Sequence, residues 1–134
     1  MDEARKNPAG LSILVVDDDE DMRKLICAML NRMNAGILVV EAHSGGEALE
    51  RLSVAREPFS IVICDWEMPG MSGIDLFKQV HASDPKLPFL MLTGRADLES
   101  VVAAKKAGIM GYLVKPVSPL QLRAKIGILL SARE

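Results

Sequence analysis

The stretch LSILVVDDDEDMRKLICAMLNRM (residues 11–33) joins a short apolar run to a helical pattern through three consecutive aspartates. The run at residues 11–16 has little polar alternation, which is typical of a strand buried on both faces of a sheet. The pattern that follows has apolar residues at the i, i+3, i+4, i+7 spacing of one helical face. The residues that this spacing predicts to face the core are Met22, Leu25, Ile26, Met29, Leu30 and Met33. The stretch therefore predicts a β-strand followed by an α-helix.

The same order of strand and helix continues along the rest of the chain, without a linker or a low-complexity stretch. Further strands are predicted at residues 37–40, 59–64, 89–92 and 109–114. Further helices are predicted at about residues 44–54, 72–81 and 96–107, and from residue 118 onward. This alternation indicates one α/β domain built around a parallel sheet.

Two of these helices carry more specific signals. Ser44 and Glu47 have the spacing of a capping box, in which each residue bonds the other's backbone at the helix start. In the helix at 72–81, the apolar residues Ile74, Phe77 and Val80 are predicted to point inward.

Composition excludes several functional classes. The chain has 134 residues, 49% of them apolar and 25% charged, with a formal charge of −2. This charge offers no basic field for a nucleic-acid backbone, so direct DNA or RNA binding is not expected. The apolar runs are far shorter than the roughly 20 residues of a membrane-spanning helix. Residues 1–10 are polar and are expected to form a flexible segment before a domain at 11–131, in a cytoplasmic protein.

The two cysteines and the two histidines are expected to lie outside the mechanism. Cys27 and Cys64 are within apolar runs and show no pairing pattern, which predicts two buried thiols in a reducing compartment. His43 and His81 lie apart, and we find no carboxylate or cysteine at ligand spacing from them. Both histidines are therefore predicted to be surface residues.

Polar residues follow four of the five predicted strands. Asp17, Asp18 and Asp19 come after the first strand, Asp65 after the third, Thr93 after the fourth and Lys115 after the fifth. The carboxyl ends of parallel strands meet at one edge of the sheet, where such folds place their ligand sites. These side chains are therefore expected to converge on one patch.

The patch suits phosphoryl transfer. Its clustered carboxylates repel one another, and the partners available to offset this are Lys115 and a hard divalent cation such as Mg²⁺, which prefers oxygen ligands. Asp65 is placed as a nucleophilic carboxylate that could accept a phosphoryl group. Lys115 and the Thr93 hydroxyl could neutralise the phosphoryl oxygens, and this step requires no general base.

Each feature also has a plain structural explanation. The acids at 17–21 could be a solvated loop that caps the first helix. Lys115 precedes a proline and could be an ordinary turn residue, and Thr93 could be a hydroxyl at a helix start. Their joint occurrence at successive strand ends favours a functional site.

Four segments together resemble the receiver domains of bacterial response regulators in two-component systems. They are ILVVDDDE (13–20), VICDWEMPGMSG (62–73), MLTG (91–94) and GYLVKP (111–116). The resemblance covers about residues 11–130, and the chain is similar to the chemotaxis type, which consists of a single receiver domain. It implies a flavodoxin-like (βα)5 fold of three layers, with sheet order 2-1-3-4-5.

The resemblance also implies roles for individual residues. Asp65 would be the phosphoacceptor, and Mg²⁺ would be held by Asp18, Asp65 and the Glu67 backbone carbonyl, with Asp17 acting through bound water. Thr93 and Lys115 would hold the phosphoryl oxygens, and the Lys115-Pro116 peptide would be cis. Tyr112 would be the aromatic switch that turns inward when Thr93 moves.

The same resemblance predicts partners. The phosphodonor would be a sensor histidine kinase or a histidine phosphotransfer protein. A downstream protein or effector domain would read the face formed by the fourth helix, the fifth strand and the fifth helix. The positions of Glu67 and Arg95 lead to a separate prediction, because each lies two residues beyond a site residue and would flank the path of water to the phosphoryl group. They could form an ion pair there, and we expect them to tune the lifetime of the phosphoryl group.

Two other functional classes remain open from the sequence. A phosphatase with an aspartyl-phosphate nucleophile would use an acid two positions after it, and Glu67 occupies that position, although the chain has no cap insertion. A metal-independent interaction module is the third possibility. The preferred interpretation is a switch driven by phosphorylation rather than an enzyme, either as a stand-alone receiver or as part of a longer regulator.

Overall fold

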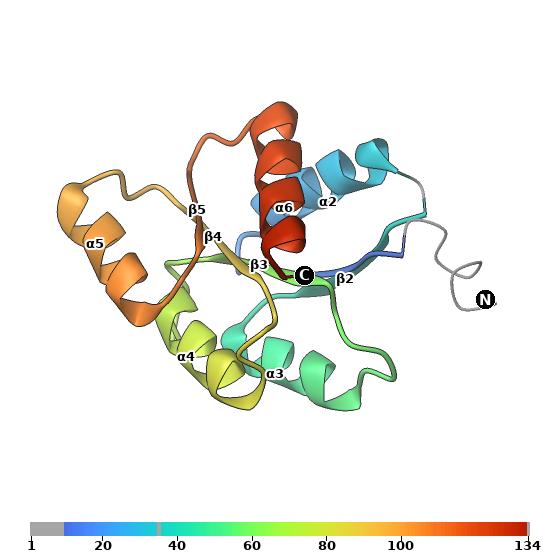
Figure 1. The fold of residues 1–134 in the computed structure, drawn as a ribbon, viewed down its shortest axis with the longest axis horizontal. Coiled ribbons are helices and arrows are strands. Elements are labelled where there is room, and N and C mark those ends of the chain that lie inside the picture. Colours follow the sequence, from blue (N-terminus) through green and yellow to red (C-terminus); the bar gives the residue numbers. More distant parts are fainter. Residues whose placement is uncertain (1–9, 35, 134) are drawn as a thin grey trace.

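A computed structural model of the chain describes residues 10–34 and 36–133. The predicted flexible segment at 1–10 lies, apart from Gly10, outside the described residues. Strands and helices alternate along the described part of the chain, as predicted (Figure 1). In chain order they are β1 (Ser12–Val16), α2 (Glu20–Met33), β2 (Leu38–Ala42), α3 (Gly45–Val54), β3 (Ile61–Asp65), α4 (Gly73–Ser83), β4 (Phe89–Thr93), α5 (Leu98–Ala107), β5 (Gly111–Val114) and α6 (Pro119–Arg133).

The sheet has the order that the family resemblance implied. Its strands are all parallel and lie in the order β2-β1-β3-β4-β5. Figure 1 shows α2 and α6 on one face of the sheet and α3, α4 and α5 on the other. The prediction of a three-layer flavodoxin-like fold is therefore confirmed.

Each face of the sheet has its own hydrophobic core. Alternate residues of β3 illustrate this, because Ile61 and Ile63 pack with α2 and α6, whereas Val62 and Cys64 pack with the helices on the other face. All four are essentially inaccessible to solvent. This two-sided burial explains the continuous apolar runs in the sequence. Cys64 and Cys27 are both free and buried, as predicted.

Two strands extend one residue beyond the apolar runs that predicted them. Asp65 is the last residue of β3 and Thr93 is the last residue of β4, rather than the first residue after each strand. The backbone ladder causes this, because Asp65 is in register with Leu92 and Thr93 with Val114. The strand pairing thus holds both side chains at the edge of the sheet.

The inward faces of two helices differ from the prediction. Leu25 of α2 is 49% exposed, and Cys27 takes its place against the sheet. In α4, Leu76 is fully buried while the predicted Ile74 is only half-buried. Helical spacing identifies an apolar stripe but not which edge of the stripe meets the sheet, and this accounts for both differences.

The start of α3 differs from the sequence analysis in two contacts, although His43 is exposed as predicted. Ser44 Oγ accepts a hydrogen bond from the Glu47 backbone N–H at 3.0 Å, which is half of the predicted capping box. The Glu47 carboxylate instead accepts the His43 backbone N–H at 2.7 Å, and the same oxygen lies 2.5 Å from His43 Nδ1. His43 therefore has a carboxylate partner that the sequence analysis overlooked, because the two residues are separated by a helix start.

No helix of the described residues is long and apolar enough to cross a membrane.

Candidate functional site

The predicted site residues meet at the carboxyl edge of the sheet. Asp17 directly follows β1 and Lys115 directly follows β5, while Asp65 and Thr93 end the two strands between them. The strand order makes β1, β3, β4 and β5 successive neighbours. A parallel α/β sheet commonly binds ligands at this edge. The structure therefore brings together residues that are up to 98 positions apart in the chain.

Three carboxylates form the acidic part of this site. Asp17, Asp18 and Asp65 each offer an oxygen atom, and these atoms all lie within 4.8 Å of one another. Asp17 is only 3% exposed, Asp65 is half-buried and Asp18 is exposed. Burial raises the pKa of the Asp17 carboxyl, and the neighbouring charge of Asp65 raises it further. The acids thus create a negative site that favours a cation.

Lys115 is the basic side chain bound to this cluster. Its Nζ lies 3.2 Å from Asp65 Oδ1 and 3.8 Å from Asp17 Oδ2, and the side chain is only 21% exposed. Its backbone N–H donates to the Thr93 carbonyl at 2.7 Å, and the Lys115-Pro116 peptide is cis, as the resemblance implied. The ammonium of Lys115 contacts two of the three carboxylates, so negative charge remains for a divalent cation to offset. The all-oxygen donor set fits Mg²⁺.

Thr93 begins a chain of hydrogen bonds that leads out of the site. Its side chain is fully buried, and its Oγ1 accepts the Arg95 backbone N–H at 3.0 Å. The Arg95 carbonyl in turn accepts the Tyr112 hydroxyl at 2.8 Å. Burial raises the pKa of this phenol, with a further contribution from Asp97. The backbone of Arg95 therefore links the two predicted switch residues.

The Arg95 side chain covers the exposed side of the same region. Its Nη2 and Nε donate to Glu67 Oε2 at 2.6 and 3.1 Å, so the ion pair expected from the sequence is present. The guanidinium carbon lies 5.0 Å from the centre of the Trp66 ring. Trp66 also meets Tyr112 edge-on, with ring centres 6.1 Å apart. Trp66 is thus well placed to report on changes at the site.

Sequence reasoning missed two residues beside the acids. Arg23 Nη1 donates to the Asp17 backbone carbonyl at 2.8 Å, and Arg23 Nε donates to Glu41 Oε1 at 2.8 Å. The available signal was weak. Glu41 is the only charged residue among the five of β2, and its register opposite Val15 places it beside the start of α2.

The packing of α4 against β3 was also not foreseen. A Cβ atom placed on Gly73 would lie 2.4 Å from the Asp65 carbonyl oxygen and 2.9 Å from Trp66 Cα. Only glycine permits this close approach of the helix start to the strand that carries Asp65.

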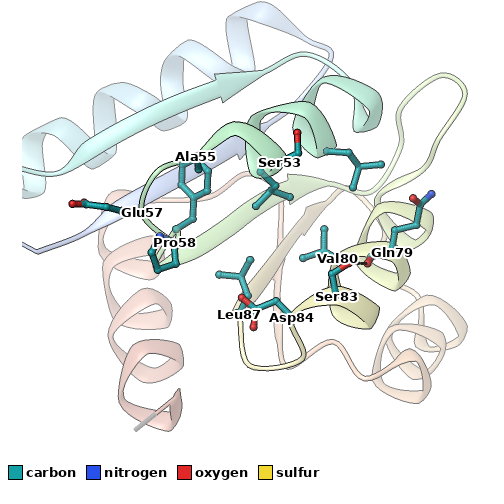
Figure 2. Close-up of a pocket in the computed structure, with 12 residues that line it drawn as sticks. Ser53, Ala55, Glu57, Pro58, Gln79, Val80, Ser83, Asp84 and Leu87 are labelled. Atoms are coloured by element: carbon teal, nitrogen blue, oxygen red, sulfur yellow. Dashed lines mark hydrogen bonds between the residues drawn. The ribbon is translucent and has the colours of Figure 1, made fainter.

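A cavity of about 330 Å³ lies elsewhere in the fold, between α3 and α4 (Figure 2). Its lining includes Pro58 and Phe59, which precede β3, and Leu87, which precedes β4. It is therefore at the amino edge of the sheet, at the other end of the strands from the carboxylates. Figure 2 shows Glu57, a carboxylate of its lining, directed away from the other labelled side chains.

A model of the response regulator receiver domain family matches residues 13–127. The chemotaxis protein CheY1 of Helicobacter pylori is 37% identical over 126 residues, which cover 92% of this chain and 100% of that protein. The chemotaxis protein CheY-3 of Vibrio cholerae is 38% identical over 119 residues, which cover 87% of this chain and 89% of that protein.

The fold is also similar to solved structures of receiver domain proteins. A response regulator receiver domain protein from Clostridium thermocellum superimposes with a TM-score of 0.83 at 30% identity, over 92% of this chain and 96% of the other. The chemotaxis protein CheY4 of Vibrio cholerae gives a TM-score of 0.80 at 33% identity, over 89% of this chain and 98% of the other.

Proposed function

The chain belongs to the response regulator receiver domain family, and on that premise we propose that Asp65 accepts a phosphoryl group from a histidine kinase or a histidine phosphotransfer protein. Membership of the family implies phosphorylation-dependent signalling. The observation that supports Asp65 as the acceptor is its half-buried carboxylate, which ends β3 beside two further acids and lies 3.2 Å from the Lys115 ammonium. The receiver domain would span residues 11–131.

The transfer step needs little from the protein beyond position and charge. A carboxylate oxygen of Asp65 would form a bond to phosphorus while the bond from phosphorus to the donor nitrogen breaks. Lys115 would bind a phosphoryl oxygen and leave its present contact with the carboxylate. The Thr93 hydroxyl would donate to another oxygen after release from the Arg95 N–H.

Mg²⁺ would be held by Asp18, Asp65 and the Glu67 backbone carbonyl, with Asp17 acting through bound water. Bound there, it would neutralise charge on the phosphoryl oxygens. The fit rests on the three convergent carboxylates, which have one ammonium to balance them.

Movement of Thr93 would carry the signal to the surface. Thr93 and Tyr112 are both bound to the backbone of Arg95, so a shift of the hydroxyl would disturb the tyrosine ring. The output face would consist of α5, β5 and α6. Exposed apolar side chains on these three elements support a partner surface there, namely Leu98, Val102, Val114 and Leu120.

Labelling with acetyl phosphate and Mg²⁺ tests the central proposal. The intact protein should gain one phosphoryl group by mass spectrometry, and Asp65→Asn should gain none, because an amide cannot act as the acceptor. Asp84→Asn is a matched control, since this exposed acid lies at the end of α4. Undiminished labelling of Asp65→Asn would refute the assignment.

A beryllofluoride mimic of the phosphoryl group tests the output face. Amide hydrogen exchange should change most between residues 93 and about 123, beyond the site itself. Changes confined to the loops at Asp17, Asp65 and Lys115 would contradict a conformational output, and the protein would then be better described as a phosphoryl relay.

A further inference from the structure

Arg23 joins three parts of the fold that meet beside the acids. It lies near the start of α2, and its side chain is only 13% exposed. One arm of the guanidinium donates to the Asp17 carbonyl at 2.8 Å, and Nε donates to the Glu41 carboxylate of β2 at 2.8 Å. The planar guanidinium can make both bonds only from one orientation, which the two acceptors together define.

The bond to Asp17 acts on the peptide that carries the acids. The Asp17 carbonyl belongs to the peptide unit between Asp17 and Asp18, and the Asp17 N–H is bound to the Ala42 carbonyl of β2 at 3.1 Å. The Asp17 carboxylate also accepts the Asp19 N–H at 2.9 Å. The short segment between β1 and α2 is therefore held by bonds from β2 and from α2. Arg23 of α2 provides the bond to the Asp17 carbonyl.

We propose that Arg23, oriented by Glu41, is a positioning residue that holds Asp17 and Asp18 in the arrangement that binds the divalent cation. This inference rests on the proposed function, because it assigns a role toward the cation of that site. Partners that orient metal ligands commonly affect metal affinity by about 10- to 100-fold.

Two possible effects of Arg23 on Mg²⁺ affinity have opposite signs, and this allows a test. Removing a cation beside an acidic metal site should, through electrostatics alone, strengthen binding of Mg²⁺. Loss of a bond that positions the acids should weaken it. Arg23→Met therefore separates the two effects, because it removes both the charge and the bond to the Asp17 carbonyl.

Lys24 offers a matched control. Its Nζ binds the other oxygen of the same carboxylate, Glu41 Oε2, at 3.1 Å, but its side chain is 58% exposed. Lys24→Met removes one positive charge that binds the same carboxylate and leaves the bond between Arg23 and Asp17 intact. Arg23→Lys keeps the charge but cannot reproduce the two-armed contact.

The experiment is a Mg²⁺ titration of the full chain followed by Trp66 fluorescence, with folding of each variant checked by circular dichroism. We expect the dissociation constant to rise about tenfold in Arg23→Met, at the lower end of the usual range, and by less in Arg23→Lys. Lys24→Met should bind Mg²⁺ as tightly as the parent or slightly more tightly. The weakening in Arg23→Met should persist at high salt, because a change of geometry is not screened.

Two results would overturn the inference. Mg²⁺ binding by Arg23→Met and Arg23→Lys that equals or exceeds the parent's would show that the bond to the Asp17 carbonyl does not position the acids. Weakening of the same size in Lys24→Met would assign the effect to Glu41 and its surroundings. A parent protein that neither responds to Mg²⁺ nor accepts a phosphoryl group would instead remove the proposed function itself, so the two failures are distinguishable.

Discussion

Substitution of Gly73 by alanine should disturb Asp65 without altering any charged group. The new methyl group would lie 2.4 Å from the Asp65 carbonyl oxygen, 2.9 Å from Trp66 Cα and 2.8 Å from Met91 Sδ. Two of these atoms belong to the backbone and cannot move aside by rotation of a side chain. The start of α4 and the end of β3 must therefore separate.

The size of the effect follows from these distances. Cβ atoms essentially never lie closer than 3.0 Å to another heavy atom, and ordinary contacts begin at 3.4 Å, so the backbone at Asp65 must shift by roughly 0.6 to 1 Å. Overpacking of this kind typically costs about 1 to 3 kcal/mol of stability. A misplacement of about 1 Å at a reacting group can lower its rate roughly 100-fold. We therefore expect the initial rate of acetyl phosphate labelling to fall by about 10- to 100-fold.

Urea denaturation and the initial rate of labelling, measured on the same preparations, check this expectation. Gly127→Ala in α6 is the control, because a Cβ there meets no heavy atom within 4 Å and alanine favours a helix by about 1 kcal/mol. The control should be slightly more stable and label at the parent's rate. A Gly73→Ala protein that labels at the parent's rate would refute the view that this close approach positions Asp65.

Two further predictions concern groups away from Asp65 itself. The side chains of Glu67 and Arg95 are 63% and 43% exposed, so the ion pair between them has an interaction free energy of about 0 to 1 kcal/mol. Removal of the pair in Glu67→Gln or Arg95→Ala should therefore speed decay of the phosphoprotein by up to about fivefold. The capacity for labelling should persist in both variants. Equal decay rates in all three proteins would argue against control by this pair. Burial raises the pKa of the Cys27 thiol to about 11 from its ordinary 9.0, so its contribution to stability should be complete below pH 9 and decline as pH rises through 11. The free energy of unfolding in urea should therefore fall more steeply above pH 9 in the parent than in Cys27→Ala, and parallel profiles would exclude this effect.

The strands and the central residues of the site could be predicted because both depend on local sequence. Two-sided burial produces apolar runs, and a parallel sheet places the ends of those runs at one edge. Asp17, Asp65, Thr93 and Lys115 were found by this reasoning alone. Roles such as that of Tyr112 came from family resemblance, because a lone aromatic residue in a strand has no distinctive spacing.

Contacts that depend on register or on backbone atoms could not be predicted. Arg23 and Glu41 are 18 residues apart, and they meet only because β2 pairs with β1 in one particular register. The partner of the Tyr112 hydroxyl is the carbonyl of Arg95, and a backbone carbonyl leaves no trace in residue identity. The exposure of Leu25 depends on how α2 is rotated against the sheet, which periodicity does not determine.

Because both faces of β3 are buried, the acid at the end of this strand also affects the strand register. If β3 slid by one residue, Ile61 and Val62 would exchange faces, and an apolar residue would still meet an apolar core. The strand lacks the alternation of polar and apolar residues that would oppose such a slip. Asp65 does offer it, because the slip would draw its carboxylate into the place of Cys64, which is wholly enclosed, and an unpaired charge is very costly there. The carboxylate of Asp65 would thus help to keep β3 in its correct register, and a variant with leucine at this position would lose that restraint.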